Sequence, residues 1–99
     1  MADKRLVIHP EALEEFKTAV SWYLARSESA AHNFVSDVDQ AVELILESPL
    51  RWPVFDYQTR RFVLRRFPFA IVYREKETAI QILAVAHGRR RPGYWKKRR

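Results

Sequence analysis

The last 13 residues of the chain combine basic and aromatic side chains in one run from His87 to Arg99. Guanidinium groups bind phosphates through paired hydrogen bonds, and aromatic rings set between them can stack on unpaired bases. Arg and Tyr can also stabilise a pentavalent phosphate, while His moves a proton near neutral pH. The run therefore indicates a single-stranded nucleic-acid interface or a metal-independent ribonuclease centre. In the alternative interpretation, Tyr94 and Trp95 anchor the chain end on the fold and the arginines are solvated.

A second basic group precedes the run and consists of Arg60, Arg61, Arg65 and Arg66. Alternation around Val63 would place Arg61 and Arg65 on one face of a strand, where they would extend the C-terminal basic run into a concave surface. The alternative is an edge strand that its charges protect from aggregation.

The remaining chemistry-bearing residues exclude several classes of site. The chain has no Cys, only three His and no zinc-binding spacing of His with carboxylates, so we expect neither a metal nor a cofactor. Two glycines cannot build a phosphate-binding loop. His9 should abut the start of a helix and His32 should lie on a helix surface. Of the three histidines, His87, beside the arginine run, is the candidate for a function.

Three further aromatic residues have two possible roles. Trp22 and Tyr23 fall in the first predicted helix, and Trp52 follows the second. They belong either to the core or to an exposed apolar groove that a partner covers.

The elements that position these residues follow from composition and periodicity. At 99 residues with 47% hydrophobic content, the chain should form a single domain over residues 1–99, with residues 88–99 as a basic tail. Residues 51–99 carry 14 basic and only three acidic side chains, which indicates an anionic partner for this half. No apolar stretch approaches the ~20 residues of a membrane span, so we expect a soluble, cytoplasmic protein without a membrane partner.

The hydrophobic pattern changes from a helical period to alternation after Pro53. The expected elements are a strand over 6–8, a helix from Pro10 to near Arg26, a helix from the caps at Ser27–Ser29 to Ser48, and strands over 61–65, 69–74 and 80–86. The last strand is apolar on both faces and should lie at the centre of the sheet. The predicted fold class is α+β in the order β-α-α-β-β-β, with a helical hairpin packed on a small, mainly antiparallel sheet.

A set of short motifs runs in order along nearly the whole chain. The set comprises His9-Pro10-Glu11-Ala12, Trp22-Tyr23, Ser48-Pro49, Arg61, the segment from Phe67 to Tyr73, Ala84-Val85-Ala86-His87 and Arg91-Pro92. Together these motifs resemble the RelE/ParE superfamily of bacterial toxin–antitoxin toxins, and the expected element order agrees with the compact α+β fold of that superfamily.

The resemblance implies a toxin that is encoded with an antitoxin, which wraps and neutralises it. The pair would repress its own operon, so operator DNA would be met only through the antitoxin complex. The candidates for antitoxin binding are Trp22, Tyr23 and Trp52.

The superfamily divides by target. RelE-like members cut messenger RNA in the ribosomal A site with basic residues and usually a C-terminal Tyr or His. ParE-like members poison DNA gyrase and need no nuclease centre. The Trp22-Tyr23 pair and the His-to-Arg-Pro ending resemble the ParE branch. The lysine pair expected of a nuclease is absent from the strand that contains Arg60 and Arg61. We therefore expect a gyrase poison, with a ribosome-dependent mRNA endonuclease as the alternative.

The two targets give two sets of candidate residues. For a nuclease, the catalytic candidates are Arg65, His87, Arg90 and Tyr94. The residues expected to bind the target or a nucleic acid are Arg60, Arg61, Arg65, Arg89, Arg90, Arg91, Tyr94 and Trp95.

Overall fold

Helix α1, Pro10–Leu24, begins where the sequence predicts and ends two residues before Arg26. Pro10 occupies the first turn, where its missing N–H group is not needed, and the His9 side chain caps this end by accepting from the Glu11 backbone N–H through Nδ1. His9 therefore abuts the helix start, as predicted. The structure is a computed structural model that describes residues 4–99.

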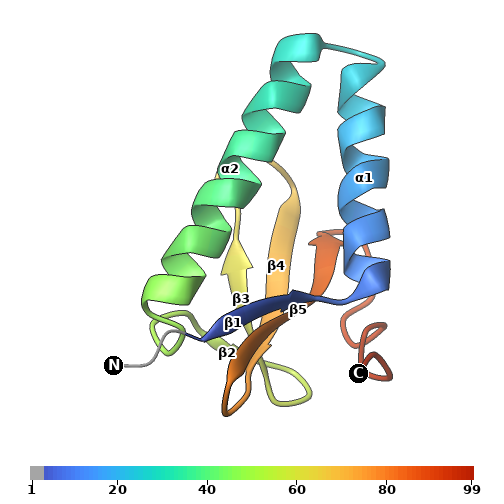
Figure 1. The fold of residues 1–99 in the computed structure, drawn as a ribbon. Coiled ribbons are helices and arrows are strands. Elements are labelled where there is room, and N and C mark those ends of the chain that lie inside the picture. Colours follow the sequence, from blue (N-terminus) through green and yellow to red (C-terminus); the bar gives the residue numbers. More distant parts are fainter. Residues whose placement is uncertain (1–3) are drawn as a thin grey trace.

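Helix α2, Glu28–Glu47, is bounded by two serines. The Ser27 hydroxyl accepts from the Ala30 N–H at the start, and Ser48, which precedes Pro49, closes the other end. Because only three residues separate the two helices, they pack as the predicted antiparallel hairpin. Both helices cover the same face of the sheet (Figure 1).

The sheet has five strands in the order β1-β5-β4-β3-β2, with β1 parallel to β5 and the other neighbours antiparallel. The strands are β1 (Arg5–Ile8), β2 (Val54–Phe55), β3 (Thr59–Val63), β4 (Phe69–Glu75) and β5 (Ala79–His87). The predicted α+β class and helical hairpin are confirmed. Two details differ: the short strand β2 was not expected, and β4 rather than β5 occupies the middle of the sheet. Strand β5 is nevertheless buried along almost all its length, because β1 and β4 lie beside it and both of its faces are covered by other parts of the chain.

The core has two layers, one on each face of the sheet. On the helix face, Phe34 stacks with Phe16 and meets Phe67 and Phe69 edge to face. On the opposite face, the C-terminal segment (residues 88–99) folds back, and Trp95 packs with Val72 and strand β5 at 2% exposure. The segment expected as a basic tail thus contributes a buried anchor to the second layer.

Candidate functional site

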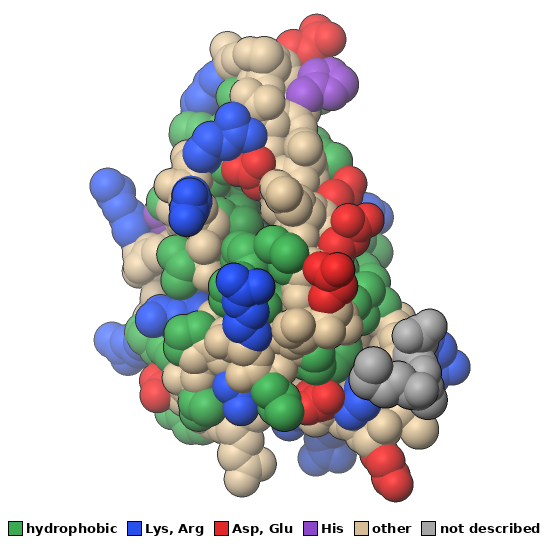
Figure 2. All heavy atoms as spheres, turned by 90° about the vertical axis from the view of Figure 1, so that its left-hand side faces the viewer, with side chains coloured by type: hydrophobic (Ala, Val, Ile, Leu, Met, Phe, Trp, Pro, Cys, Tyr) green, Lys and Arg blue, Asp and Glu red, His purple; other side chains and the backbone are tan. Residues whose placement is uncertain are grey.

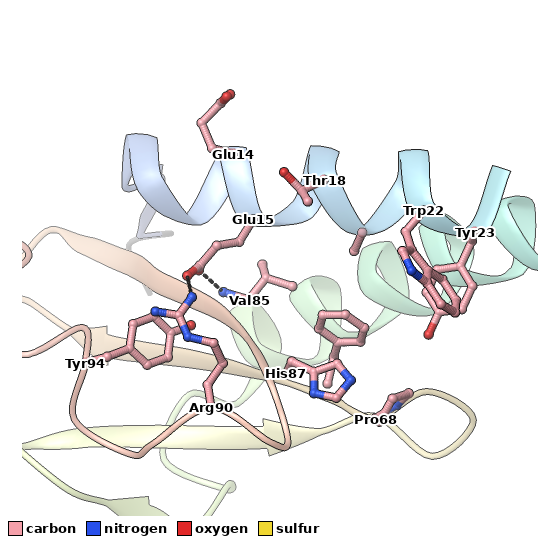
Figure 3. Close-up of a pocket in the computed structure, with 12 residues that line it drawn as sticks. Glu14, Glu15, Thr18, Trp22, Tyr23, Pro68, Val85, His87, Arg90 and Tyr94 are labelled. Atoms are coloured by element: carbon pink, nitrogen blue, oxygen red, sulfur yellow. Dashed lines mark hydrogen bonds and ion pairs between the residues drawn. The ribbon is translucent and has the colours of Figure 1, made fainter. Parts of the chain in front are cut away.

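An apolar groove of about 530 Å³ runs between α1, the end of β5 and the C-terminal segment (Figure 3). We call it the α1 groove. It is lined by Glu14, Glu15, Thr18, Ala19, Trp22, Tyr23, Pro68, Phe69, Val85, His87, Arg90 and Tyr94. The groove brings together residues from both of the predicted sets, the partner-binding aromatics and the C-terminal basic run.

One end of the α1 groove is aromatic. Trp22 is 52% exposed and meets Tyr23 edge to face, while the guanidinium of Arg26 lies 3.7 Å above the Trp22 ring. Tyr23 is half-buried because it packs against Phe34 and Phe67. An exposed tryptophan beside a fixed aromatic partner forms an apolar surface that a binding partner could cover.

The other end of the α1 groove is organised by Glu15. Its carboxylate accepts two hydrogen bonds of 3.0 Å from the Arg98 guanidinium and one of 3.0 Å from the Val85 backbone N–H. Arg90 lies 3.6 Å from the same carboxylate (Figure 3). One carboxylate therefore offsets the charge of two arginines, which leaves this end of the groove less cationic than the sequence implies.

The Glu15–Arg98 pair also completes the edge of the sheet. Strand β1 pairs with β5 only as far as Ile82, so within residues 4–99 the next residues of β5 have β4 on one side and no strand on the other. Arg98 donates to the Leu83 carbonyl at 2.9 Å, and Glu15 accepts from Val85. These side chains satisfy backbone groups that a longer β1 would have paired. The pair therefore holds the C-terminal segment, α1 and β5 together.

Sequence reasoning missed Glu15, although a signal was present. Ala12 lies three residues before Glu15 and Ala19 four residues after it, and both alanines are buried. Residues at this spacing share one face of a helix, so the position of Glu15 requires a partner for a buried carboxylate.

Tyr94 lies between two guanidinium groups, with Arg90 3.7 Å and Arg98 4.9 Å from the centre of its ring. Its hydroxyl is buried and forms no hydrogen bond with any residue of the range 4–99. Burial raises the pKa of the Tyr94 hydroxyl far above its ordinary value, and the nearby Glu15 carboxylate raises it further. A buried phenol with a raised pKa is a weaker proton donor than an ordinary tyrosine.

His87 is the last residue of β5 and points into the α1 groove (Figure 3). Its ring meets Phe69 edge to face at 5.0 Å, and its Nδ1 accepts from the Arg89 backbone N–H at 3.0 Å. Because that hydrogen bond occupies Nδ1, Nε2 is the nitrogen left to meet a ligand.

The arginines of the second basic group are dispersed. Arg60 donates to the Leu50 and Trp52 carbonyls and so holds the loop after α2. The guanidinium of Arg61 lies 4.0 Å from the centre of the Phe55 ring on the face opposite the helices. Arg65 is exposed and lies outside the α1 groove, in the segment after the end of β3 at Val63.

The structure therefore brings together only part of each predicted set. Of the nuclease candidates, His87, Arg90 and Tyr94 line the groove and Arg65 does not. Of the partner-binding candidates, Trp22 and Tyr23 line it, whereas Trp52 packs on Phe62 elsewhere. Of the remaining target-binding candidates, Arg89 and Arg91 are exposed, and Trp95 is buried beneath the sheet.

A second apolar surface lies between the two helices and β1. Its most exposed side chains are Ile8, Leu13 and Leu46, at 44%, 39% and 37% exposure. Figure 2, which shows the left-hand side of Figure 1, has hydrophobic side chains at the surface and acidic side chains along one margin of this view.

Within residues 4–99, no group of three or more His or carboxylate residues is placed to hold a metal ion.

A sequence model of the family described as "ParE toxin of type II toxin-antitoxin system, parDE" matches residues 6–92. The chain belongs to the ParE toxin family. This result confirms the resemblance to the RelE/ParE superfamily and, within it, the ParE branch. The family match does not extend to Trp95 and Arg98. The roles of these two residues are therefore inferred from the contacts described above.

A solved structure has the same fold as this ParE toxin. It is titled "Chromosomal ParDE TA system from P. aeruginosa", with a TM-score of 0.75 and 21% sequence identity. The alignment covers 86% of this chain and 96% of that chain. No curated protein matches the chain.

In the range 4–99, no helix is long and apolar enough to cross a membrane.

Proposed function

We propose that this ParE toxin inhibits bacterial growth by poisoning DNA gyrase in the cytoplasm and that a cognate antitoxin neutralises it. The observation that carries the choice of target is the state of the nuclease candidates. Arg65 lies outside the α1 groove, and the Tyr94 hydroxyl is buried with a raised pKa. A metal-independent nuclease needs accessible groups that donate and accept protons at the scissile phosphate. A gyrase poison needs a binding surface and no such groups.

One observation favours the alternative, a RelE-like endonuclease that cuts ribosome-bound messenger RNA. His87, Arg90 and Tyr94 share a groove, and Nε2 of His87 is free to meet a ligand. However, Arg90 faces the Glu15 carboxylate at 3.6 Å, which weakens its attraction for a phosphate. We therefore retain the gyrase poison as the proposed activity.

The α1 groove supports the proposed antitoxin site. Its aromatic end offers Trp22 and Tyr23, and exposed tryptophans are frequent energetic centres of protein interfaces. The partner that fits would insert apolar side chains beside Trp22 and place acidic side chains near Arg26 and Arg90. Trp52 lies apart, so the proposal rests on the first two aromatics. Operator DNA would be recognised by the antitoxin of the complex.

We expect that inducing this chain alone stops growth and that co-expressing the protein encoded beside its gene restores growth. Trp22→Ala should stay toxic but lose neutralisation. Removing an exposed aromatic anchor should weaken antitoxin binding by about 2 kcal/mol, or roughly 30-fold in the dissociation constant. Colony counts report the first effect, and calorimetry on the purified pair reports the second.

Leu50→Ala is the matched control, because Leu50 is 66% exposed and lies outside the α1 groove. This variant should be neutralised as well as the unmodified chain. Harmless induction with no copurifying partner would contradict the toxin proposal. Equal losses of antitoxin affinity in the two variants would contradict the assignment of the antitoxin site to the α1 groove.

A further inference from the structure

A cleft of about 680 Å³ lies where the turn between β4 and β5 approaches the C-terminal segment. We call it the basic cleft. Among residues 4–99 its lining is entirely cationic, namely Arg74, Lys76, Lys96, Lys97, Arg98 and Arg99. The last four belong to the C-terminal run that indicates a nucleic-acid interface, but none of the six is among the individual residues expected to bind the target or a partner.

Most of the charges in the basic cleft are uncompensated. Arg98 is neutralised by Glu15 and Glu11 on α1. Within the described residues 4–99, none of the other five cations has a carboxylate within ion-pair distance. Two carboxylates flank Lys76 in sequence: Glu75 is held by Lys4 at 3.0 Å, and Glu77 forms no ion pair within residues 4–99. Since like charges repel, a surface of this kind is stabilised when an anion binds between them.

Two polar groups on the neighbouring strands have no partner among residues 4–99. Arg74 on β4 stands opposite Gln81 on β5 in the sheet register. Arg74 uses one terminal nitrogen to donate to the Arg98 carbonyl at 3.1 Å, but its Nε is buried without an acceptor among residues 4–99. The Gln81 Oε1 is also buried and unpaired within this range. The Arg74 guanidinium is held by the backbone at the lining of the cleft, where its positive charge attracts an oxyanion.

We infer that the basic cleft binds the phosphates of a DNA duplex independently of base sequence. Phosphate contacts to a duplex require only correctly spaced cations, whereas single-stranded nucleic acid needs exposed rings for stacking. Within the described residues 4–99, no aromatic and no apolar side chain lines the cleft, so an acidic protein segment would find no apolar anchor among them.

The inference builds on the proposed function, because gyrase holds duplex DNA and a toxin that grips this DNA would stay on the enzyme–DNA complex. It also separates two kinds of DNA contact. The antitoxin reads the operator sequence, and the basic cleft contacts any duplex through its backbone.

The test is the salt dependence of binding to a labelled DNA duplex of arbitrary sequence, measured by fluorescence anisotropy with the full chain. Lys96→Gln/Lys97→Gln removes two exposed charges from the cleft. Each lost phosphate contact lowers the slope of log K against log salt by about 0.9, so the slope should fall by about 2. The loss should be equal on two unrelated duplex sequences.

Lys17→Gln/Arg51→Gln is the matched control, because it removes the same charge from exposed positions outside the cleft. It should leave the slope nearly unchanged, and circular dichroism should show both variants folded. An equal fall in slope for the two variants would overturn the inference. So would tighter binding of single-stranded RNA or of polyglutamate than of the duplex at the same salt.

This measurement contains no gyrase. Its failure would remove the DNA contact and leave the proposed target standing, whereas failure of the gyrase proposal would leave the measured DNA contact intact.

Discussion

Glu15→Ala should lower the free energy of unfolding by about 3 to 5 kcal/mol, the cost of breaking a buried ion pair by removing one partner. The Arg98 side chain is 9% exposed and that of Glu15 is 15% exposed, so the change would leave the buried guanidinium with Glu11 alone, whose side chain is 66% exposed and lies 3.4 Å away. The Val85 N–H would also lose its acceptor. Urea or thermal denaturation followed by circular dichroism measures the effect.

Glu14→Ala is the control on the neighbouring residue. The Glu14 side chain is 72% exposed and lies 3.7 Å from Lys17 on the helix surface. Its removal should change stability by less than about 0.5 kcal/mol. Replacing both Glu15 and Arg98 by Leu should recover part of the loss, because neither of these two buried charges then remains, although the Val85 N–H and the Leu83 carbonyl still lose their partners. Equal effects of the Glu14 and Glu15 variants would contradict the role assigned to the pair.

Trp95→Ala should destabilise the protein by about 3 to 5 kcal/mol, as expected for removing a large buried aromatic side chain. Trp95 is 2% exposed and stacks with Phe55 at 5.4 Å between ring centres. It also covers Val72 and Leu83 on the sheet face that the helices leave open. Chemical denaturation gives the loss directly.

Trp22→Ala removes the same side chain from a position that is 52% exposed and should cost about 1 kcal/mol, because its contacts with Tyr23 and Arg26 are lost. If the two tryptophan variants were equally stable, the C-terminal segment would not be part of the core. A truncation from Tyr94 onward is therefore an unsuitable test of target binding, because it also removes Trp95 and Arg98 from the fold.

Most of the fold could be predicted from the sequence because short local patterns mark where its helices and strands begin and end. Pro10, Ser27 and Ser48 mark the helix ends, and the change to alternation marks the strands. Strand β2 was missed because two residues, Val54–Phe55, are too few to show a period. The middle position of β4 was also not predictable from hydrophobicity, since β5 is the more apolar strand and lies one place away.

The candidate site was only partly predictable because its decisive contacts join distant residues. Trp22 and Tyr23 were recognised as partner-binding candidates from their types and positions on α1. The pair of Glu15 and Arg98 spans 83 positions in sequence, and no local pattern identifies which carboxylate meets which arginine. The expected face shared by Arg61 and Arg65 depended on a strand that ends earlier, at Val63.

The most direct measurement of the central claim is incubation of the purified chain with DNA gyrase, ATP and plasmid. A gyrase poison should cause loss of supercoiling and accumulation of cleaved DNA. Tyr94→Phe should give the same result, because that change removes only a buried hydroxyl. A nuclease would instead lose about 100-fold or more in cleavage rate on losing a catalytic proton donor. The proposal that this toxin poisons gyrase would be contradicted if gyrase were unaffected and if the unmodified chain, but not Tyr94→Phe, cut messenger RNA within codons.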